Sequence, residues 1–394
     1  MDQKNIENVE GFNLFFQLAQ TKFSRVFLGN SDTNPFEFYA IKKIMIKIAS
    51  DELIENLKSE SKLLFSLNHS NIVTILKEME VNDHFYFVLE YCEIGDGFDF
   101  LKRYSNFFKR SPTQKIIQKI ILSLTKGVIY LHKKNILHRD LKLKNVLLKY
   151  KDFSKLIGEN YKNLKFPDKS SQNYEYEIKK TFRNIKDFGK DFLFNFKNNI
   201  SVEEFDDFFI ENIDIKLIDL GVSKILKDDE ITKSIIINNY SAPEMRNKLG
   251  YTFPSDFWNI GAIAYCLMTG KVPSILNTDN AEELTIDEKF WSSIEIIDFI
   301  NCLLQKDPKK RLTEKNILQH PFLSKNPSCF KVQKCNFKLN FNKKENLCGL
   351  WEDVEFNDDK ETNLETVLIE NFDLFTKMPI KENYFDYLYR SFKK

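Results

Sequence analysis

The chain has 394 residues, of which 42% are hydrophobic and 29% are charged. This composition is typical of a globular chain with one large or two ordinary domains, and it excludes an intrinsically disordered chain. The 58 basic and 57 acidic residues nearly cancel. The net charge of +1 therefore gives no support to attraction of the whole surface to nucleic acid or to anionic lipid.

The six cysteines are scattered and form no CxxC pair, so the sequence predicts neither a zinc site nor a disulfide framework. The first twelve residues are polar and lack the apolar core of a signal peptide. Residues 258–268 form the most apolar stretch, which is too short to span a bilayer and predicts a buried core helix. We therefore expect a soluble cytoplasmic protein without a membrane span, and the nucleus stays open as a second location.

The first part of the chain has the pattern of a strand-rich segment. Apolar and polar residues alternate over residues 12–48, and residues 71–79 and 84–91 also read as strands. Between them, residues 53–67 carry leucines at the three- and four-residue spacing of a helix. After a short linker at 92–97 the pattern becomes mainly helical. The expected architecture is α+β, with a small antiparallel β-rich lobe that contains one main helix, followed by a larger, mainly helical lobe.

A polar stretch stands directly before an apolar one at residues 138–148, which read HRDLKLKNVLL. This stretch resembles the catalytic loop of eukaryotic protein kinases, and it is of the Ser/Thr type because Lys142 lies two residues after Asp140. The resemblance implies that Asp140 accepts or orients the proton of the substrate hydroxyl. It also implies that Lys142 steadies the γ-phosphate and that Asn145 binds Mg²⁺. His138 would have a structural role, and Arg139 would meet a phosphate on the activation loop.

Other stretches resemble the nucleotide-binding parts of the same family, in the same order along the chain. Lys42 ends the motif AIK on a predicted strand and would grip the α- and β-phosphates of ATP, and Glu60 on the following helix would pair with it. LEYCEIGD resembles the hinge at about 90–96, where backbone groups of Glu90 and Cys92 would bond adenine and Asp96 could reach the ribose. The side chains expected to enclose the adenine are apolar: Leu18, Val26, Ala40 and Leu147.

The motifs that follow resemble the family's metal-binding and supporting elements. Asp219 in IKLIDLG would be the second Mg²⁺ ligand. Glu244 in SAPE would pair with Arg311, and Asp256 would brace the backbone of the catalytic loop. Thr232 and Ser234 precede SAPE and are candidate phosphorylation sites of the activation loop.

The resemblance covers about residues 12–323 and implies a kinase domain. Its N-lobe would span about 12–91, its hinge about 90–96 and its C-lobe about 97–323. A Lys-, Asn- and Phe-rich insert at about 150–212 separates the catalytic loop from Asp219. The insert ends in a predicted amphipathic helix, with a capping box and one aromatic face formed by Ser201, Glu204, Phe205, Phe208 and Phe209. It is interpreted either as a surface expansion or as a docking or regulatory element.

Residues 324–394 form a C-terminal tail of unknown role, with strand-like alternation at 337–341 and two helical stretches after it. A regulatory protein could dock there. The alternation has the wrong period for a calmodulin-binding helix, so this function is disfavoured.

Two departures from the family pattern affect the expected activity. The nucleotide-covering loop reads AQTKFSRV at 19–26, so Ala19, Thr21 and Ser24 stand where the family has glycines that let the backbone approach the phosphates. Ile237 stands, by alignment on Tyr240, where Ser/Thr kinases have a threonine that bridges the catalytic aspartate and lysine. Isoleucine cannot form this bridge.

The sequence suggests three functions. The first is an ATP- and Mg²⁺-dependent Ser/Thr protein kinase that acts on protein substrates. The second is a pseudokinase scaffold that binds nucleotide weakly or not at all and signals through protein interactions. The third, nucleic-acid binding through the lysine-rich insert, has only local charge behind it, and we expect no nucleic-acid partner.

Overall fold

A computed structural model of the chain describes most of the expected catalytic region. The described residues are 6–20, 24–34, 37–45, 65–153, 200–218, 224–225, 238–246, 250–272, 294–324 and the single positions 177, 180, 187, 189, 193 and 194. The expected helix over 53–67, the activation loop with Thr232 and Ser234, and the tail fall wholly or almost wholly outside these residues. Of the two units into which the chain divides, the one formed by 1–151 and 166–351 holds every element named below.

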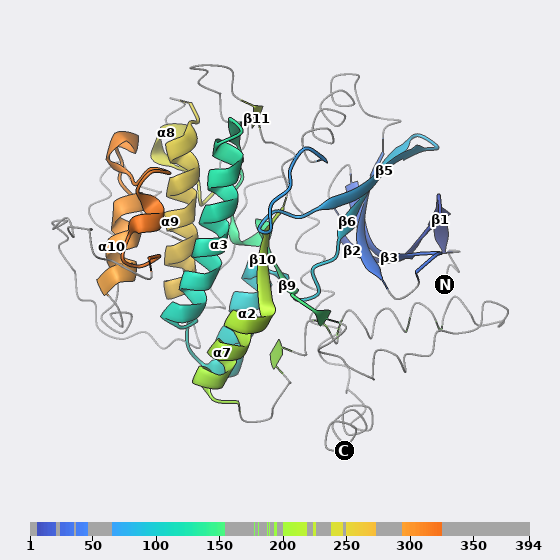
Figure 1. Ribbon diagram of the computed structural model, residues 1–394, viewed down its shortest axis with the longest axis horizontal. Helices are drawn as coiled ribbons and strands as arrows, with labels where there is room; N and C mark the ends of the chain where they lie inside the picture. The colour runs from blue at the N-terminus through green and yellow to red at the C-terminus, as the bar shows by residue number, and fades with distance from the viewer. Residues whose placement is uncertain are drawn as a thin grey trace. The chain divides into compact units, whose positions relative to one another are not determined.

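Six antiparallel strands form the N-terminal sheet (Figure 1), in the order β1-β2-β3-β4-β6-β5. The strands are β1 (Glu7–Val9), β2 (Phe12–Gln20), β3 (Ser24–Ser31), β4 (Phe38–Met45), β5 (Ile75–Val81) and β6 (His84–Glu90). Alternate residues of β6 enter different hydrophobic clusters, with Phe85, Phe87 and Leu89 in one and Tyr86 and Val88 in the other. This is the two-residue period of a strand that is covered on both faces. The strands expected from the alternation are thus confirmed.

A smaller sheet follows, in the order β10-β9-β7. Its strands are β7 (Gly95–Asp96), β9 (Val146–Tyr150) and β10 (Ile213–Leu217). Strands β8 (Ile136–Leu137) and β11 (Lys224–Ile225) form a separate two-stranded sheet. In the antiparallel pair of β9 and β10, Tyr150 lies opposite Ile213 and Val146 opposite Leu217. The chain therefore leaves this sheet at Tyr150 and returns to it at the neighbouring position.

The rest of the described chain is mainly helical. Its helices are α2 (Gly97–Phe108), α3 (Gln114–His132), α7 (Val202–Asn212), α8 (Pro243–Arg246), α9 (Phe253–Thr269) and α10 (Ile294–Leu303), with 3-10 turns η1 (Leu143–Asn145), η4 (Pro308–Lys310) and η5 (Ile317–Gln319). Helix α9 packs against both α3 and α10, and it is buried continuously from Ser255 to Thr269. The apolar stretch at 258–268 is therefore the core helix that the sequence predicted. No helix among the described residues is long and apolar enough to cross a membrane.

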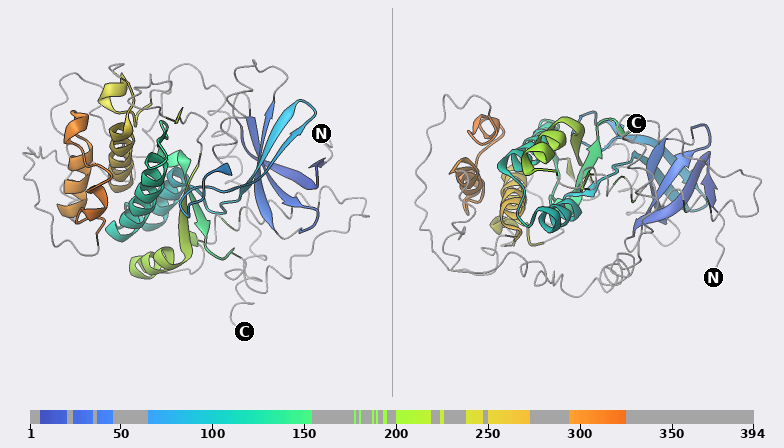
Figure 2. Two further views of the ribbon diagram at one scale, coloured as in Figure 1. Left: turned by 45° about the horizontal axis from the view of Figure 1, so that its top comes forward. Right: turned by 90° about the horizontal axis from the view of Figure 1, so that it is seen from below.

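Helix α7, which the sequence assigned to the end of the insert, packs against α3 (Figure 2). Its predicted capping box is present, since Ser201 and Glu204 each accept from the other's backbone N–H at 3.1 Å. Phe205 and Phe209 are fully buried, and the ring of Phe209 lies 5.1 Å from that of Phe100 on α2. Burial of two such side chains contributes roughly 3–6 kcal/mol. Helix α7 is thus part of the packed core and not a surface expansion.

Candidate active site

In the segment between β8 and β9, the side chains of Lys142 and Asn145 meet at the carboxylate of Asp140. Asp140 is only 3% exposed, and its Oδ2 lies 3.0 Å from Lys142 Nζ. Asn145 Nδ2 donates to the same oxygen at 3.1 Å and to the Asp140 carbonyl at 2.7 Å. The turn η1 folds the chain back, so that Asn145 faces a residue five positions earlier. The structure therefore brings together the predicted base, the predicted phosphate-binding lysine and one predicted metal ligand.

Asp256, at the start of α9, holds the backbone of this loop. Its Oδ2 accepts from His138 N at 3.1 Å, and its Oδ1 accepts from Arg139 N at 3.2 Å. Arg139 has φ 69°, in the left-handed region that costs a non-glycine residue roughly 1–2 kcal/mol. The two hydrogen bonds to Asp256 offset this strain at the residue that precedes the candidate base. The predicted contact between Asp256 and the loop backbone is thus present.

Side-chain donors keep Asp256 ionised although it is completely buried. Burial alone would raise the pKa of Asp256. A 2.8 Å hydrogen bond from His132 Nε2, the electrostatic attraction of His132, and a hydrogen bond from the Tyr251 hydroxyl outweigh burial and hold this pKa below its usual range. The support of the loop is therefore a carboxylate at neutral pH.

The imidazole of His138 connects the catalytic loop to the end of β10. His138 Nδ1 accepts from Asp140 N at 3.3 Å, so the ring proton lies on Nε2, which donates to the Ile218 carbonyl at 3.2 Å. Ile218 N in turn donates to the Asn145 carbonyl at 3.0 Å. Ile218 directly precedes Asp219, the other predicted metal ligand, which lies outside the described residues. His138 thus lies between the catalytic loop and the residue that precedes Asp219.

One residue of the site was missed by the sequence analysis. Asn238 Nδ2 donates to Asp140 Oδ1 at 3.0 Å, from a segment almost one hundred residues further along the chain. The alignment on Tyr240 placed the expected contact at Ile237, whose side chain cannot donate. The signal that could have found Asn238 is a hydrogen-bonding side chain one position after the expected one.

Apolar side chains from both sheets form the expected adenine-binding region. Ala40 and Leu147 pack against one cluster that contains Leu89 and Cys92. Leu18 packs, together with Ala40, against a neighbouring cluster of the N-terminal sheet. Within the N-terminal sheet, Ala40 on β4 lies opposite Leu89 on β6.

Lys42, which is predicted to bind the α- and β-phosphates, lies on β4, the strand that carries Ala40. Lys42 of β4 pairs with Val26 of β3 in the sheet register, and it lies two residues after Ala40 and hence on the same face. Val26 also lies opposite Ala19 of β2, so the two strands that carry the nucleotide-covering loop stay paired up to Gln20 and Arg25. Glu60, the predicted partner of Lys42, lies outside the described residues.

The segment expected to contact adenine carries side chains with different environments. Glu90 accepts from Lys149 Nζ and Lys216 Nζ, both at 2.9 Å, and from Thr74 N at 2.8 Å. Burial would raise the pKa of Glu90, but the two lysines outweigh burial and lower it. Burial raises the pKa of the Cys92 thiol well above its usual range, so Cys92 behaves as a small hydrophobe.

Glu93 is a buried carboxyl in the same segment. Burial raises its pKa to about 7, although its own backbone N–H and that of Tyr150, at 3.2 Å, donate to it.

Asp96 caps α2, because its Oδ1 accepts from Phe98 N at 2.9 Å and from Asp99 N at 2.8 Å. The proposed contact of Asp96 with a ribose stays a prediction.

The predicted pair of Glu244 and Arg311 is a buried, two-pronged ion pair. Arg311 Nη1 and Nη2 lie 2.7 Å from Glu244 Oε1 and Oε2, and Ser255 Oγ donates to Oε1 at 2.7 Å. Arg311 is 3% exposed and lies over the ring of Trp258. The pair fixes the end of the segment that carries Asn238 to the core helix α9.

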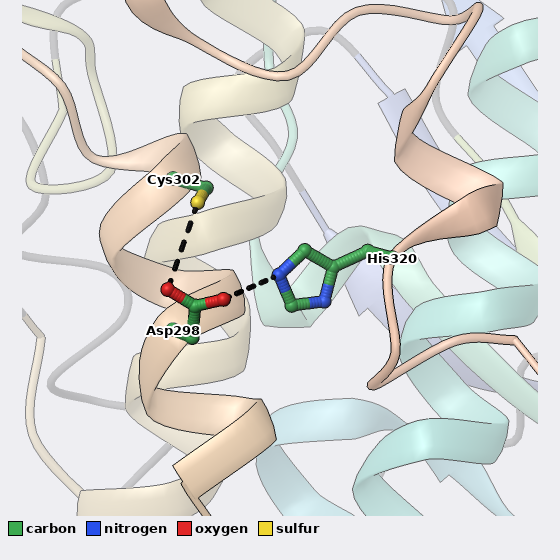
Figure 3. A group of neighbouring side chains, drawn as sticks. All are labelled: Asp298, Cys302 and His320. Atoms are coloured by element: carbon green, nitrogen blue, oxygen red, sulfur yellow. Dashed lines mark hydrogen bonds and ion pairs between the residues drawn. The ribbon is translucent and has the colours of Figure 1, made fainter. Parts of the chain in front are cut away.

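A second polar cluster, far from Asp140 in the sequence, has the composition of a metal site. Asp298 and Cys302 lie on α10, and His320 faces them from the segment that follows η5 (Figure 3). His320 Nδ1 accepts from Phe322 N at 3.2 Å, so the ring proton is on Nε2, which donates to Asp298 Oδ2 at 3.1 Å. Asp298 and His320 are thus a buried hydrogen-bonded pair that joins α10 to the segment after η5.

The comparison with protein families agrees with this geometry. The family model described as the protein kinase domain matches residues 13–158 and 197–323, well over half of the chain. The chain therefore belongs to the protein kinase family, with the α+β fold of that family. Helix α7 lies within the matched residues, and residues 159–196 lie between the two matched parts.

Several protein kinases are similar to the chain over most of its length. The myosin light chain kinase A of Dictyostelium discoideum is 27% identical over 79% of this chain and 88% of its own. The probable serine/threonine-protein kinase fhkE of the same organism is 28% identical over 82% of this chain and 40% of its own. Serine/threonine-protein kinase 33 of Bos taurus is 28% identical, over 73% of this chain and 50% of its own. The chain spans half or less of the length of the last two relatives. It is a protein kinase of the serine/threonine type.

Proposed function

We propose that the protein transfers the γ-phosphate of ATP to serine or threonine hydroxyls of protein substrates, with Mg²⁺ as the metal. The observation that carries this proposal is the arrangement at Asp140, whose two oxygens receive N–H groups from Lys142, Asn145 and Asn238. A carboxylate held in this way can accept or orient the proton of an acceptor hydroxyl. Binding alone would not require a fixed base.

The other residues of the site have roles that follow from their chemistry. Ala40 and Leu147 would contact the two faces of the adenine, and Lys42 would neutralise phosphate charge. Lys142, at the side of Asp140, would stabilise the charge of the transferred phosphoryl group. Each of these side chains acts by position and charge, which is what phosphoryl transfer requires.

The donor set fits Mg²⁺. Asn145 uses Nδ2 for its hydrogen bonds to Asp140, which leaves the amide oxygen Oδ1 for a cation. Together with the carboxylate of Asp219 this would give the hard oxygen ligands that Mg²⁺ prefers. When bound, the metal would neutralise charge on the phosphates.

A second candidate function is a scaffold with a kinase fold. It is favoured by Ala19, Thr21 and Ser24 in place of the loop glycines, because their side chains hinder close approach of the backbone to phosphates. Such a protein would bind nucleotide weakly or not at all and would signal through protein interactions. The sequence at 159–196 and the tail are the candidate docking elements in either case.

We place the protein in the cytoplasm, where ATP and protein substrates are abundant. The buried thiols of Cys92, Cys266 and Cys302 agree with a reducing compartment.

The test is transfer of labelled γ-phosphate from ATP and Mg²⁺ to a generic basic protein, with wild type and Asp140→Asn compared side by side. We expect label on serine or threonine and a loss of roughly 10²–10⁴-fold in rate in Asp140→Asn, since that variant lacks the base. If the wild type transfers nothing, the result favours the scaffold, and the melting temperature with and without ATP and Mg²⁺ then shows whether this scaffold binds nucleotide. Equal transfer by both proteins would show that the label comes from another enzyme.

A further inference from the structure

Asn238 supplies a donor to the candidate base at a place where the sequence offers none in the expected position. We propose that Asn238 is a positioning residue, which holds the carboxylate of Asp140 in the orientation that receives the substrate proton. It takes the place of the hydroxyl that the family's threonine would provide at Ile237. This inference rests on the proposed kinase activity.

The two oxygens of the Asp140 carboxylate are contacted by different segments of the chain. Asn238 Nδ2 donates to Oδ1 at 3.0 Å, whereas Lys142 and Asn145 contact Oδ2. Rotation of the carboxylate about its Cβ–Cγ bond would break contacts on both oxygens. Removal of Asn238 leaves one oxygen without its amide donor, and the carboxylate can then rotate.

The orientation of the Asn238 amide is fixed by its other contacts. Its Oδ1 accepts from Tyr240 N at 2.8 Å and from the Ser241 hydroxyl at 3.4 Å. A flipped amide would direct Oδ1 at the Asp140 carboxylate and Nδ2 at the N–H of Tyr240, and both contacts would be repulsive. Asn238 is therefore the donor and Asp140 the acceptor.

The backbone that carries Asn238 is also held. Asn238 N donates to Ser241 Oγ at 2.8 Å, and its carbonyl accepts from Ser241 N at 3.0 Å and from Arg246 Nη2 at 3.0 Å. A side chain on a backbone fixed in this way can set the orientation of a neighbour to within the tolerance that catalysis requires.

A buried asparagine of α9 joins the Asn238 segment to the catalytic loop. Asn259, 1% exposed, donates through Nδ2 to the Leu141 carbonyl at 3.2 Å and to the Tyr240 carbonyl at 3.0 Å. Leu141 follows Asp140, and Tyr240 lies two residues after Asn238. The two segments that meet at the candidate base are thus fixed to one helix.

A purely structural function of Asn238 makes a different prediction. The contact between Oδ1 and Tyr240 N is a turn that aspartate forms as well as asparagine. Asn238→Asp therefore keeps this turn, but it replaces the donor to Asp140 with a second carboxylate oxygen. A structural role would leave Asn238→Asp active, and a positioning role would not.

The experiment measures kcat, KM for ATP and the pH dependence of kcat for wild type, Asn238→Asp and a matched control. Asn106→Asp makes the same change at an exposed position of α2 and serves as that control. We expect Asn238→Asp to lower kcat roughly 10²-fold with KM for ATP changed less than about threefold. The acidic limb of its pH profile should also move upward by about one unit, because a like charge beside a carboxylate disfavours ionisation.

A second variant keeps the inference testable if Asn238→Asp does not fold. Asn238→Ala should lower kcat roughly tenfold or more, and addition of Ile237→Thr should restore part of that loss by returning a hydroxyl to the family's position. Asn238→Asp or Asn238→Ala with wild-type kcat would overturn this inference and leave the proposed function intact. A wild type that transfers no phosphate would overturn the proposed function, and this inference with it.

Discussion

Two buried carboxyl groups support different parts of this molecule, and their pKa values are shifted in opposite directions. Asp256, beneath the catalytic loop, receives hydrogen bonds from two backbone N–H groups and from the side chains of His132 and Tyr251. Glu93, in the segment that joins the N-terminal sheet to α2, receives only backbone N–H groups. The pKa of Asp256 is lowered, and that of Glu93 is raised to about 7.

The difference shows that the number and charge of donors, and not burial alone, decide whether a buried carboxyl is ionised. Glu90 lies three residues before Glu93 and confirms this, because two lysines lower its pKa. The charged carboxylates hold strained or separate segments together. The carboxyl without charged donors is the one whose ionisation opposes folding.

Removal of the Asp256 charge should have the largest effect. Asp256→Asn keeps the size of the side chain but replaces one oxygen with an NH₂ group, so one of the two backbone N–H groups of the catalytic loop loses its acceptor. We expect a loss of roughly 3 kcal/mol or more in the free energy of unfolding, and a fall in kcat of at least about 10²-fold. Urea denaturation and phosphate transfer measure the two effects.

Asp207→Asn is the control for this variant. Asp207 lies on the exposed side of α7, 3.6 Å from the exposed Lys115, and its pair should contribute less than about 1 kcal/mol. Equal stability of Asp256→Asn and Asp207→Asn would show that Asp256 does not hold the loop.

Glu93→Gln should have an intermediate effect of the opposite sign. The folded-state pKa of Glu93 is raised from 4.5 to about 7, so its neutral form favours folding, and this contribution is lost as the pH rises from about 4.5 to about 7. Glutamine stays neutral and can still accept from Tyr150 N. At pH 8 the variant should therefore be more stable than the wild type, by up to about 3 kcal/mol, and at pH 4 the two should be equal.

Urea denaturation of both proteins at several pH values between 4 and 8 measures this difference. A stability difference that does not depend on pH would contradict the raised pKa.

Glu90→Gln should have the smallest effect. The pKa of Glu90 is lowered, so its charge stabilises the fold above about pH 4.5, and this contribution is lost as the pH falls through the lowered pKa. At pH 7 we expect the variant to be roughly 1–2 kcal/mol less stable than the wild type, because Lys149 and Lys216 lose a charged partner. The difference should shrink below pH 4 and in high salt. Thermal unfolding at pH 7 and below pH 4, each at two salt concentrations, would detect a failure of either trend.

The local pattern of the sequence predicted much of this fold. The two-residue alternation located the strands of the N-terminal sheet, and the run of apolar residues at 258–268 located the core helix α9. The resemblance of its motifs to the kinase family also predicted the contacts of Asp256 with the catalytic loop and of Glu244 with Arg311. These predictions succeeded because each depends on a residue type at a fixed place in one element.

Contacts between distant segments that no family motif implies were harder to predict. The contact of Asn238 with Asp140 depends on the reach of an amide side chain and on a turn held by Ser241, and an alignment of positions contains neither. The amphipathic pattern of α7 was visible, but nothing in it indicates that Phe100, about one hundred residues earlier, is its partner. The functional roles of Asp219, Glu60, Thr232 and Ser234 stay predictions.

The pairing of Tyr150 with Ile213 has a consequence for how this chain tolerates additional sequence. Both ends of the intervening stretch are fixed at neighbouring points of one sheet, and α7 is anchored beside its second end. Closing a longer loop between fixed points costs only about 0.6 kcal/mol for each doubling of its length. The stretch between Tyr150 and Ile213 can therefore be lengthened at a small cost in loop closure, provided that the buried side chains of Leu193 and Phe194 stay in place.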